Sequence, residues 1–411
     1  MRRALLIALV LLFVAACGDS SLSGQSSSTI TLGAIYPLSG PQAPGGKEEL
    51  GGVQAALQLA QAQGVLSKPV QLRIIDAVTP DAATAAVNRL VQQDHVPAIL
   101  GTYGSTLSAA ASARAEQLKT IYWETGAVAD PITAQRRYVF RTVATGSSLG
   151  RMAVTFTHDV LIPASGLTAP RVVVVRVNDI YGQSVSGGEV ALAQRLGINV
   201  ADVITYNPNA FDPNALAAQI ASDRADFLWD VSYLTDGVAI WKAIQSAHVP
   251  LKAAVGTSSA FCMPEFGREL GAAAIGVYAA DKPDAVGSEM ALTTDGRKLL
   301  AQAKSVYEQH NHQAMSIPAV AGFVGAWTLL HEVLPKISGA ITPDSIRAAA
   351  LQVDVPVGDS INGGGVKFSA EGSPDEGQNT LAAAVVGQWQ GIQDMRIVYP
   401  PAYATAKPLL R

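Results

Sequence analysis

Ser105 is the residue whose type and position most directly suggest ligand chemistry. It stands between a predicted strand, 98–101, and a predicted helix that starts at Thr106. The first N–H groups of a helix have no partner within it, and the helix dipole places partial positive charge there. A serine hydroxyl beside these groups suits a bound carboxylate. The same serine could instead cap the helix, and the two roles are compatible.

A second candidate is the segment 146–150, whose sequence GSSLG matches the GxSxG pattern of a serine nucleophile elbow. In such an elbow a strand runs directly into the serine. Here the preceding segment, 138–143, carries several polar residues and is separated from the motif by Ala144 and Thr145. The spacing assigns no histidine or acid to Ser148, so the alternative is a Ser-rich helix start. A hydrolase using Ser148 is therefore only a fallback hypothesis.

Other motifs for metal or cofactor chemistry are missing from the sequence. The six histidines form no HExxH pair, and His310 and His312 lie at a polar helix end that favours solvation. There is no phosphate loop of the GxxxxGK type and no GxGxxG string. The glycines of 363–365 are interpreted as a flexible crossover. We expect no cofactor and no metal, and the sequence favours a binding protein over an enzyme.

The beginning of the chain predicts export. Arg2 and Arg3 precede an apolar run, 4–16, which is shorter than the about 20 residues that span a bilayer. With small residues at its end, the segment 1–16 has the pattern of a secretory signal. Cys17 follows directly and resembles the cysteine of a bacterial lipobox, which is acylated; the alternative is an ordinary signal with a chance cysteine. Residues 17–29 are rich in Ser and Gly and would form a flexible tether to the membrane.

Composition narrows the class of protein further. The 411 residues are 49% hydrophobic and 15% charged, which is typical of a globular chain with sizeable cores. The net charge of −4 and the lack of a basic cluster argue against nucleic acid as a partner. Apart from Cys17 there is a single cysteine, Cys262, which we expect to be a small buried residue. An exported chain without an internal disulfide must rely on core burial.

The order of the predicted elements indicates an α/β fold with two parts. Short apolar strands alternate with helices between residues 30 and 123, and the alternation restarts between 147 and 256. This pattern predicts right-handed βαβ units and two doubly wound parallel sheets. A mostly helical section, about 282–353, and a strand-like tail, 381–398, follow. Ligands bind beyond the carboxyl ends of such strands, so two facing lobes would share one cleft.

Several short stretches, in this order and spacing, resemble one family over essentially the whole region after residue 29. The family is the Leu/Ile/Val-binding group of type I periplasmic binding proteins. The stretches are LGAIYPLSGP at 32–41, ID at 75–76 with Pro80, ILG at 99–101, GST at 104–106, GA at 126–127, NDIYG at 178–182, DF at 226–227 and VYP at 398–400. The resemblance implies two lobes joined by three crossovers. We expect lobe 1 to comprise 30–145 and 281–355, and lobe 2 to comprise 146–280 and 356–411.

The resemblance also implies a ligand site in the first lobe. Family members hold the ligand's carboxylate with a serine that corresponds to Ser105, beside Thr106. Gly126 and Ala127 match a segment whose backbone faces the ligand. Val128 stands where the family usually has a threonine that hydrogen-bonds the ligand, which valine cannot do.

In the second lobe the resemblance implies that Tyr181 and Tyr233 close over the ligand; packing in the core or at the surface is the alternative for each. Ser258 stands where amino-acid binders have an acid for the ammonium group, so we expect a carboxylate or amide ligand without an obligatory ammonium. Asp230, near a strand end, could replace that acid or could simply be solvated. Gly45 falls near a position that is often aromatic, which predicts a roomier pocket.

The family acts as the binding component of ABC importers. The sequence therefore predicts an extracytoplasmic lipoprotein, at the outer face of the cell membrane or in the periplasm. We expect a monomer that captures a small-molecule ligand by hinge closure and delivers it to a permease and ATPase complex. A sensor domain that reports to a membrane receptor is the alternative.

Overall fold

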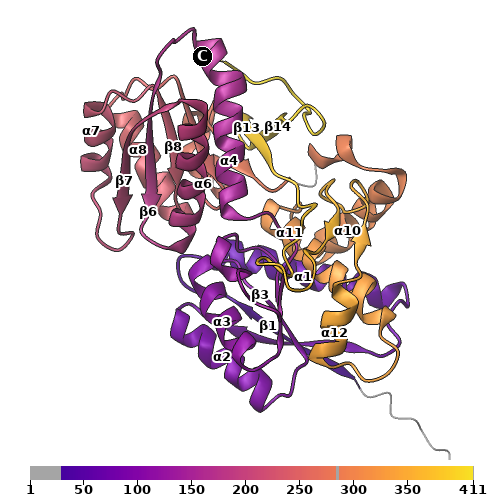
Figure 1. The fold of residues 1–411 in the computed structure, drawn as a ribbon. Helices are drawn as coiled ribbons and strands as arrows, with labels where there is room; N and C mark the ends of the chain where they lie inside the picture. Colours follow the sequence, from indigo (N-terminus) through magenta and orange to yellow (C-terminus); the bar gives the residue numbers. More distant parts are fainter. Residues whose placement is uncertain (1–28, 284–286, 411) are drawn as a thin grey trace, which may run out of the picture.

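The protein consists of two α/β lobes that are stacked end to end in Figure 1. The computed structural model describes residues 29–283 and 287–410. The predicted signal segment, Cys17 and nearly all of the predicted tether lie outside the described residues. Each lobe is built around its own sheet, and the chain passes between the lobes more than once.

The first lobe contains a five-stranded parallel sheet with the order β2-β1-β3-β4-β5. Its strands are β1 Ile30–Tyr36, β2 Val70–Asp76, β3 Ala98–Gly101, β4 Ile121–Glu124 and β5 Val139–Arg141. Alternate residues of β1 enter different cores: Leu32 and Ala34 face the helix α1 (Ala43–Ala62), whereas Ile35 faces α2 (Pro80–Gln92) and α3 (Ser105–Gln117). The helix α2 begins after Thr79, whose Oγ1 accepts a hydrogen bond from the Ala82 N–H at 3.2 Å.

The helical section after the second lobe returns to the first. It comprises η4 Gly287–Ala291, α10 Thr294–Asn311, α11 Ile317–Trp327, η5 Thr328–Val333, η6 Leu334–Lys336 and α12 Pro343–Ala350. The continuous helical run Ile317–Lys336 is long and apolar enough to cross a membrane, but 83% of its most apolar window is buried inside the fold. It packs against α1 in the core of the first lobe, which explains its composition.

The second lobe contains a seven-stranded sheet with the order β14-β13-β10-β9-β8-β6-β7. The parallel strands are β6 Arg171–Val177, β7 Asn199–Tyr206, β8 Phe227–Val231, β9 Ala253–Thr257 and β10 Tyr278–Asp281. The antiparallel pair β13 Val385–Gly391 and β14 Asp394–Tyr399 extends one edge and confirms the predicted tail. The four consecutive valines of β6 are buried on both faces, as their run predicts.

Helices cover both faces of this second sheet. They are α4 Gly146–Phe156, η2 Thr157–Leu161, α5 Ile162–Ser165, α6 Ile180–Leu196, α7 Pro213–Ser222, α8 Leu234–Ser246, α9 Pro264–Leu270 and η3 Gly271–Ala274. A short 3₁₀ turn, η1 Asp130–Ile132, belongs to the first lobe. The doubly wound α/β class predicted from the alternation is therefore present in both lobes.

The residues after α12 differ from the predicted division of the chain. β11 (Asp354–Val355) pairs with β12 (Val366–Lys367), and Phe368 packs edge-on against Trp123 and Phe140 in the first lobe. Residues 361–368 therefore belong to the first core, although the sequence analysis placed 356–411 in lobe 2. The reason is a long-range pairing that no local pattern records.

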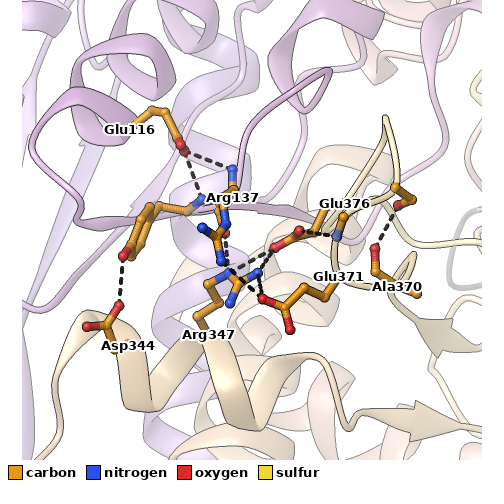
Figure 2. A network of polar contacts seen from close by, with 10 residues as sticks. Glu116, Arg137, Asp344, Arg347, Ala370, Glu371 and Glu376 are labelled. Atoms are coloured by element: carbon orange, nitrogen blue, oxygen red, sulfur yellow. Dashed lines mark hydrogen bonds and ion pairs between the residues drawn. The ribbon is translucent and has the colours of Figure 1, made fainter.

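Ion pairs hold the next segment to the first lobe as well (Figure 2). Arg347 of α12 pairs with Glu371 at 3.0 Å and with Glu376. Arg137 reaches the same Glu371 at 3.0 Å, and the Tyr138 hydroxyl donates to Asp344 at 2.7 Å. The chain leaves the first lobe only after this network.

Candidate ligand-binding site

A small cavity lies where the two lobes meet, at the carboxyl ends of their parallel strands. Seven of the nine predicted site residues line it: Ser105, Gly126, Ala127, Val128, Tyr181, Tyr233 and Ser258. The other lining residues are Glu49, Tyr103, Ser259, Cys262, Asp281, Lys282, Ile317 and Pro318. The lining is therefore polar and includes charged side chains from both lobes.

Ser105 is the first residue of α3 and is almost completely buried at the cavity wall. Its hydroxyl accepts a hydrogen bond from the Ala129 N–H at 3.2 Å and makes no capping bond to the helix. Gly104, without a side chain, is the N-cap residue. Ser105 thus keeps its hydroxyl proton for another acceptor, whereas the capping alternative is not what the structure shows.

The backbone at Gly126 and Ala127 is engaged by a buried side chain. Both N–H groups donate to Oε1 of Glu124, each at 2.7 Å. Ser108 donates to the other oxygen, Oε2, as does the N–H of Thr102 at 3.3 Å. Burial raises the pKa of Glu124 to about 7, although these hydrogen bonds oppose the shift. Two N–H groups that the resemblance assigns to the ligand therefore point at an internal carboxyl group.

Tyr181 and Tyr233 form the wall of the second lobe, with ring centroids 5.2 Å apart. The Tyr181 hydroxyl donates to the Thr257 carbonyl, and the Tyr233 hydroxyl donates to Asp179 Oδ2 at 2.8 Å. Thr106 does not line the cavity, but its hydroxyl donates to the same Asp179 oxygen at 3.3 Å. Asp179 thus joins the first lobe to the second beside the cavity.

An ion pair that the sequence analysis missed lies beside Ser258. Lys282 Nζ is 3.1 Å from Asp281 Oδ1 and 3.3 Å from Ser258 Oγ, and all three residues are buried. Burial is the largest single effect and lowers the pKa of Lys282, but the charge and hydrogen bond of Asp281, together with Cys262 and Glu49, raise the pKa above its usual value. Asp281 ends β10, and two consecutive charges after an apolar strand are the signal that could have identified them.

Glu49 and Tyr103 also enter the cavity from the first lobe. Glu49 lies on α1, is fully buried and accepts a hydrogen bond from the Thr125 hydroxyl at 2.5 Å. The Tyr103 ring occupies the space beside Gly45, where a built Cβ would overlap it. The expectation of a roomier pocket at Gly45 is therefore wrong, because the ring of Tyr103, which precedes α3, fills that space.

Asp230 does not reach the cavity. It lies in β8 with 1% exposure, and Ser232 donates a hydrogen bond to its Oδ1. Burial raises its pKa to about 7, and the nearby Asp236 adds to the rise. The acids that line the cavity are Glu49 and Asp281 instead. The site therefore contains acidic groups, although Ser258 itself is neutral.

Comparison with known proteins identifies the family. The family model described as periplasmic binding protein matches residues 29–390. This chain belongs to the periplasmic binding protein family. Leu/Ile/Val-binding protein homolog 8 of Brucella abortus is 28% identical to it over 396 residues, which cover 95% of each chain. Homolog 7 of Brucella suis is likewise 28% identical, over 94% of this chain and 95% of the relative.

Solved structures share the type I fold of this periplasmic binding protein. The leucine-binding protein LivK of Thermotoga maritima superimposes with a TM-score of 0.75 at 19% identity, covering 90% of this chain and 97% of the other. A solute-binding protein of R. palustris in complex with benzoate gives the same score and identity, covering 92% and 98%. These likenesses confirm the predicted fold class, and the match to the family model confirms the predicted family.

The GxSxG segment of this periplasmic binding protein lies at a different surface groove. Ser148 is in the first turn of α4, where its hydroxyl accepts hydrogen bonds from Thr145 Oγ1 and Arg151 Nη2, each at 2.8 Å. The groove residues are Asp130, Thr133, Ala134, Ala144, Thr145, Ser147, Ser148, Arg151, Ser369, Asp375, Gln378, Asn379, Thr380 and Ala382. None of these is a histidine, so this lining supplies no imidazole base for Ser148. Across residues 29–283 and 287–410, no cluster of three metal-ligating side chains occurs either.

Proposed function

We propose that this protein is the substrate-binding lipoprotein of an ABC importer and not an enzyme. The single observation that carries the proposal is the polar cavity enclosed between the two lobes, with side chains from both walls. A ligand there is in contact with both halves of a clamp. Ligand binding would therefore be coupled to the relative position of the lobes.

The remaining parts of the proposal follow from the family and from the beginning of the sequence. Acylation of Cys17 would anchor the chain outside the cell membrane, with residues 17–29 as a tether. The closed clamp would then be presented to a permease and its ATPase, and the solute would be an amino acid, an amide or a small carboxylate. The polar side chains in the lining and the helix terminus at Ser105 support a polar solute.

Closure can be measured directly by small-angle scattering. We expect the radius of gyration of the purified protein to fall when a bound solute is added to saturation, because the solute bridges two lobes that otherwise separate. The hydrogen bond from Thr106 to Asp179, which joins the two lobes in the structure, is one of the contacts that the closed state would contain. An unchanged radius at saturating solute would show that binding does not move the lobes.

A further inference from the structure

The charges around the cavity do not favour a second anion. Two acids, Glu49 and Asp281, and one base, Lys282, line it. Lys282 is already paired with Asp281 at 3.1 Å. The lining carries one net negative charge when Glu49 is ionised and is neutral when Glu49 is protonated; in neither state does it offer an unpaired positive charge to a bound carboxylate. Charge balance therefore favours a ligand that brings a cation or hydrogen-bond donors.

Both acids also have an oxygen without a partner. Oε2 of Glu49 and Oδ2 of Asp281 are buried and accept no hydrogen bond, whereas their other oxygens are bonded to Thr125 and Lys282. The exposed fraction of Glu49 is 0% and that of Asp281 is 1%. A buried acceptor without a donor costs about 1–3 kcal/mol. A ligand with N–H groups directed at both residues, one from each lobe, would remove that cost.

The hydrogen-bond donors that would bind a carboxylate are, in contrast, partly engaged by another side chain of the protein. The N–H groups of Gly126 and Ala127 donate to Glu124, and Val128 supplies no hydroxyl. Ser105 and the start of α3 remain as donors. They can hold one carbonyl or carboxylate oxygen, but they do not enclose a carboxylate from several sides.

Three tyrosine rings in the cavity lining also favour a bound cation. Tyr103, Tyr181 and Tyr233 all line the cavity together with the two acids. The negative face of an aromatic ring attracts an ammonium group, and cages of such rings recognise organic cations. The two carboxylates and the aromatic rings therefore favour the same class of ligand, a cation.

From these observations we infer that the cavity recognises a small protonated amine, whose N–H groups bind Glu49 and Asp281, and that the ligand needs no carboxylate. The inference rests on the proposed function, since it names the solute that the clamp captures. It replaces the expectation of a ligand without an ammonium group, because the acids that the sequence analysis sought at Ser258 come from α1 and from the end of β10. An amide or carboxylate oxygen at Ser105 is tolerated but is not required.

Binding of an amine should also change the number of protons bound to the protein. Burial, followed by the charge of Glu124, raises the pKa of Glu49 to about 8, and Thr125 and Lys282 oppose the rise. The other ionisable groups facing it are Tyr36 and Tyr122. In the empty site Glu49 is therefore protonated at neutral pH, and a bound ammonium group favours its ionised form. Binding should release a proton, and affinity should rise as the pH rises toward about 8, the pKa of Glu49 in the empty site.

The test is calorimetry with pairs of probes that share a carbon skeleton. One pair is 3-methylbutylamine and 4-methylpentanoate, with leucine and leucinamide as compounds that carry the amine; a second pair is benzylamine and benzoate. We expect each amine that binds to do so at least tenfold more tightly than the matching acid. Binding of 4-methylpentanoate or benzoate without binding of the amines would overturn the inference and leave solute capture intact. No heat from any probe, amine or acid, would count against solute capture and against this inference together.

Two variants and a matched control locate the interaction. Glu49→Gln and Asp281→Asn should each weaken binding of the amine probe at least tenfold, and Glu49→Gln should abolish the proton release measured in buffers of different ionisation enthalpy. Glu48→Gln is the control, because Glu48 is the next residue of α1, is buried and is bonded to Ser316 at 2.6 Å, but does not line the cavity. The Glu48→Gln variant should bind the amine probe with the same affinity as the unsubstituted protein. Should Asp281→Asn fail to fold, Glu49→Gln decides, and unchanged affinity in that variant contradicts the inference.

Discussion

Replacing Gly52 by leucine is expected to lower the free energy of unfolding by about 3 kcal/mol or more. Gly52 lies on α1 where this helix crosses α11, and a Cβ built on it would overlap the backbone carbonyl of Ala319. Backbone cannot rotate away as a flexible side chain can. The same crossing has a second close approach, because a Cβ on Gly322 would overlap the Glu49 carbonyl. Glycine at Gly52 is therefore a packing requirement of the first core.

Urea unfolding of both variants of a matched pair measures this effect. Gly187 is also a helical glycine, on α6, but it is exposed and a Cβ there meets no atom within 4 Å. Gly187→Leu should be neutral or slightly stabilising, since leucine has the higher helix propensity. Equal effects at Gly52 and Gly187 would show that the helix crossing is looser than described.

Replacing Arg141 by methionine should be comparably destabilising, by about 3–5 kcal/mol. The side chain is fully buried at the end of β5. It donates to the Ala129 carbonyl and to Gln378 Oε1, each at 2.6 Å, and to the Thr133 hydroxyl at 3.2 Å. Methionine fills much of the volume but leaves these acceptors without donors. It also removes the positive charge that stabilises ionised Glu124.

Arg73→Met provides the comparison for this charge deletion. The Arg73 side chain is 49% exposed, and its ion pair with Asp94 is 3.6 Å long. An exposed pair of this kind contributes less than about 1 kcal/mol. If Arg141→Met lowered the free energy of unfolding by no more than Arg73→Met does, the structural role of the buried network would be contradicted.

Local sequence pattern predicted the elements well because their causes are local. The run of valines in β6 and the cap at Thr79 each depend on residues within one strand or one helical turn. The approximate position of the cavity also followed, because the carboxyl ends of parallel strands meet at one edge. That placement brought Ser105 and Tyr181 to the same cavity.

The chemistry of the cavity was less predictable because it depends on contacts between distant segments. Glu49 is an ordinary acid of a helix in the sequence, and contacts with distant segments, such as Thr125 and Gly322 of α11, bury it. The Tyr103 ring fills the space beside Gly45 of α1, and this contact joins two segments that are distant in the sequence. Likewise, the pairing of β11 with β12 keeps residues after 356 in the first lobe.

A thermal-shift screen of the chain from Ser28 onward tests the central claim, capture of a small polar solute between the lobes, most directly. The panel would contain amino acids, amides, amines, short-chain acids and aromatic acids. A solute at 100 times its Kd should stabilise the protein by about 2.7 kcal/mol, which raises Tm by several degrees. The account predicts such a saturable shift with at least one solute of the panel. A cooperative unfolding transition that no solute moves would contradict it.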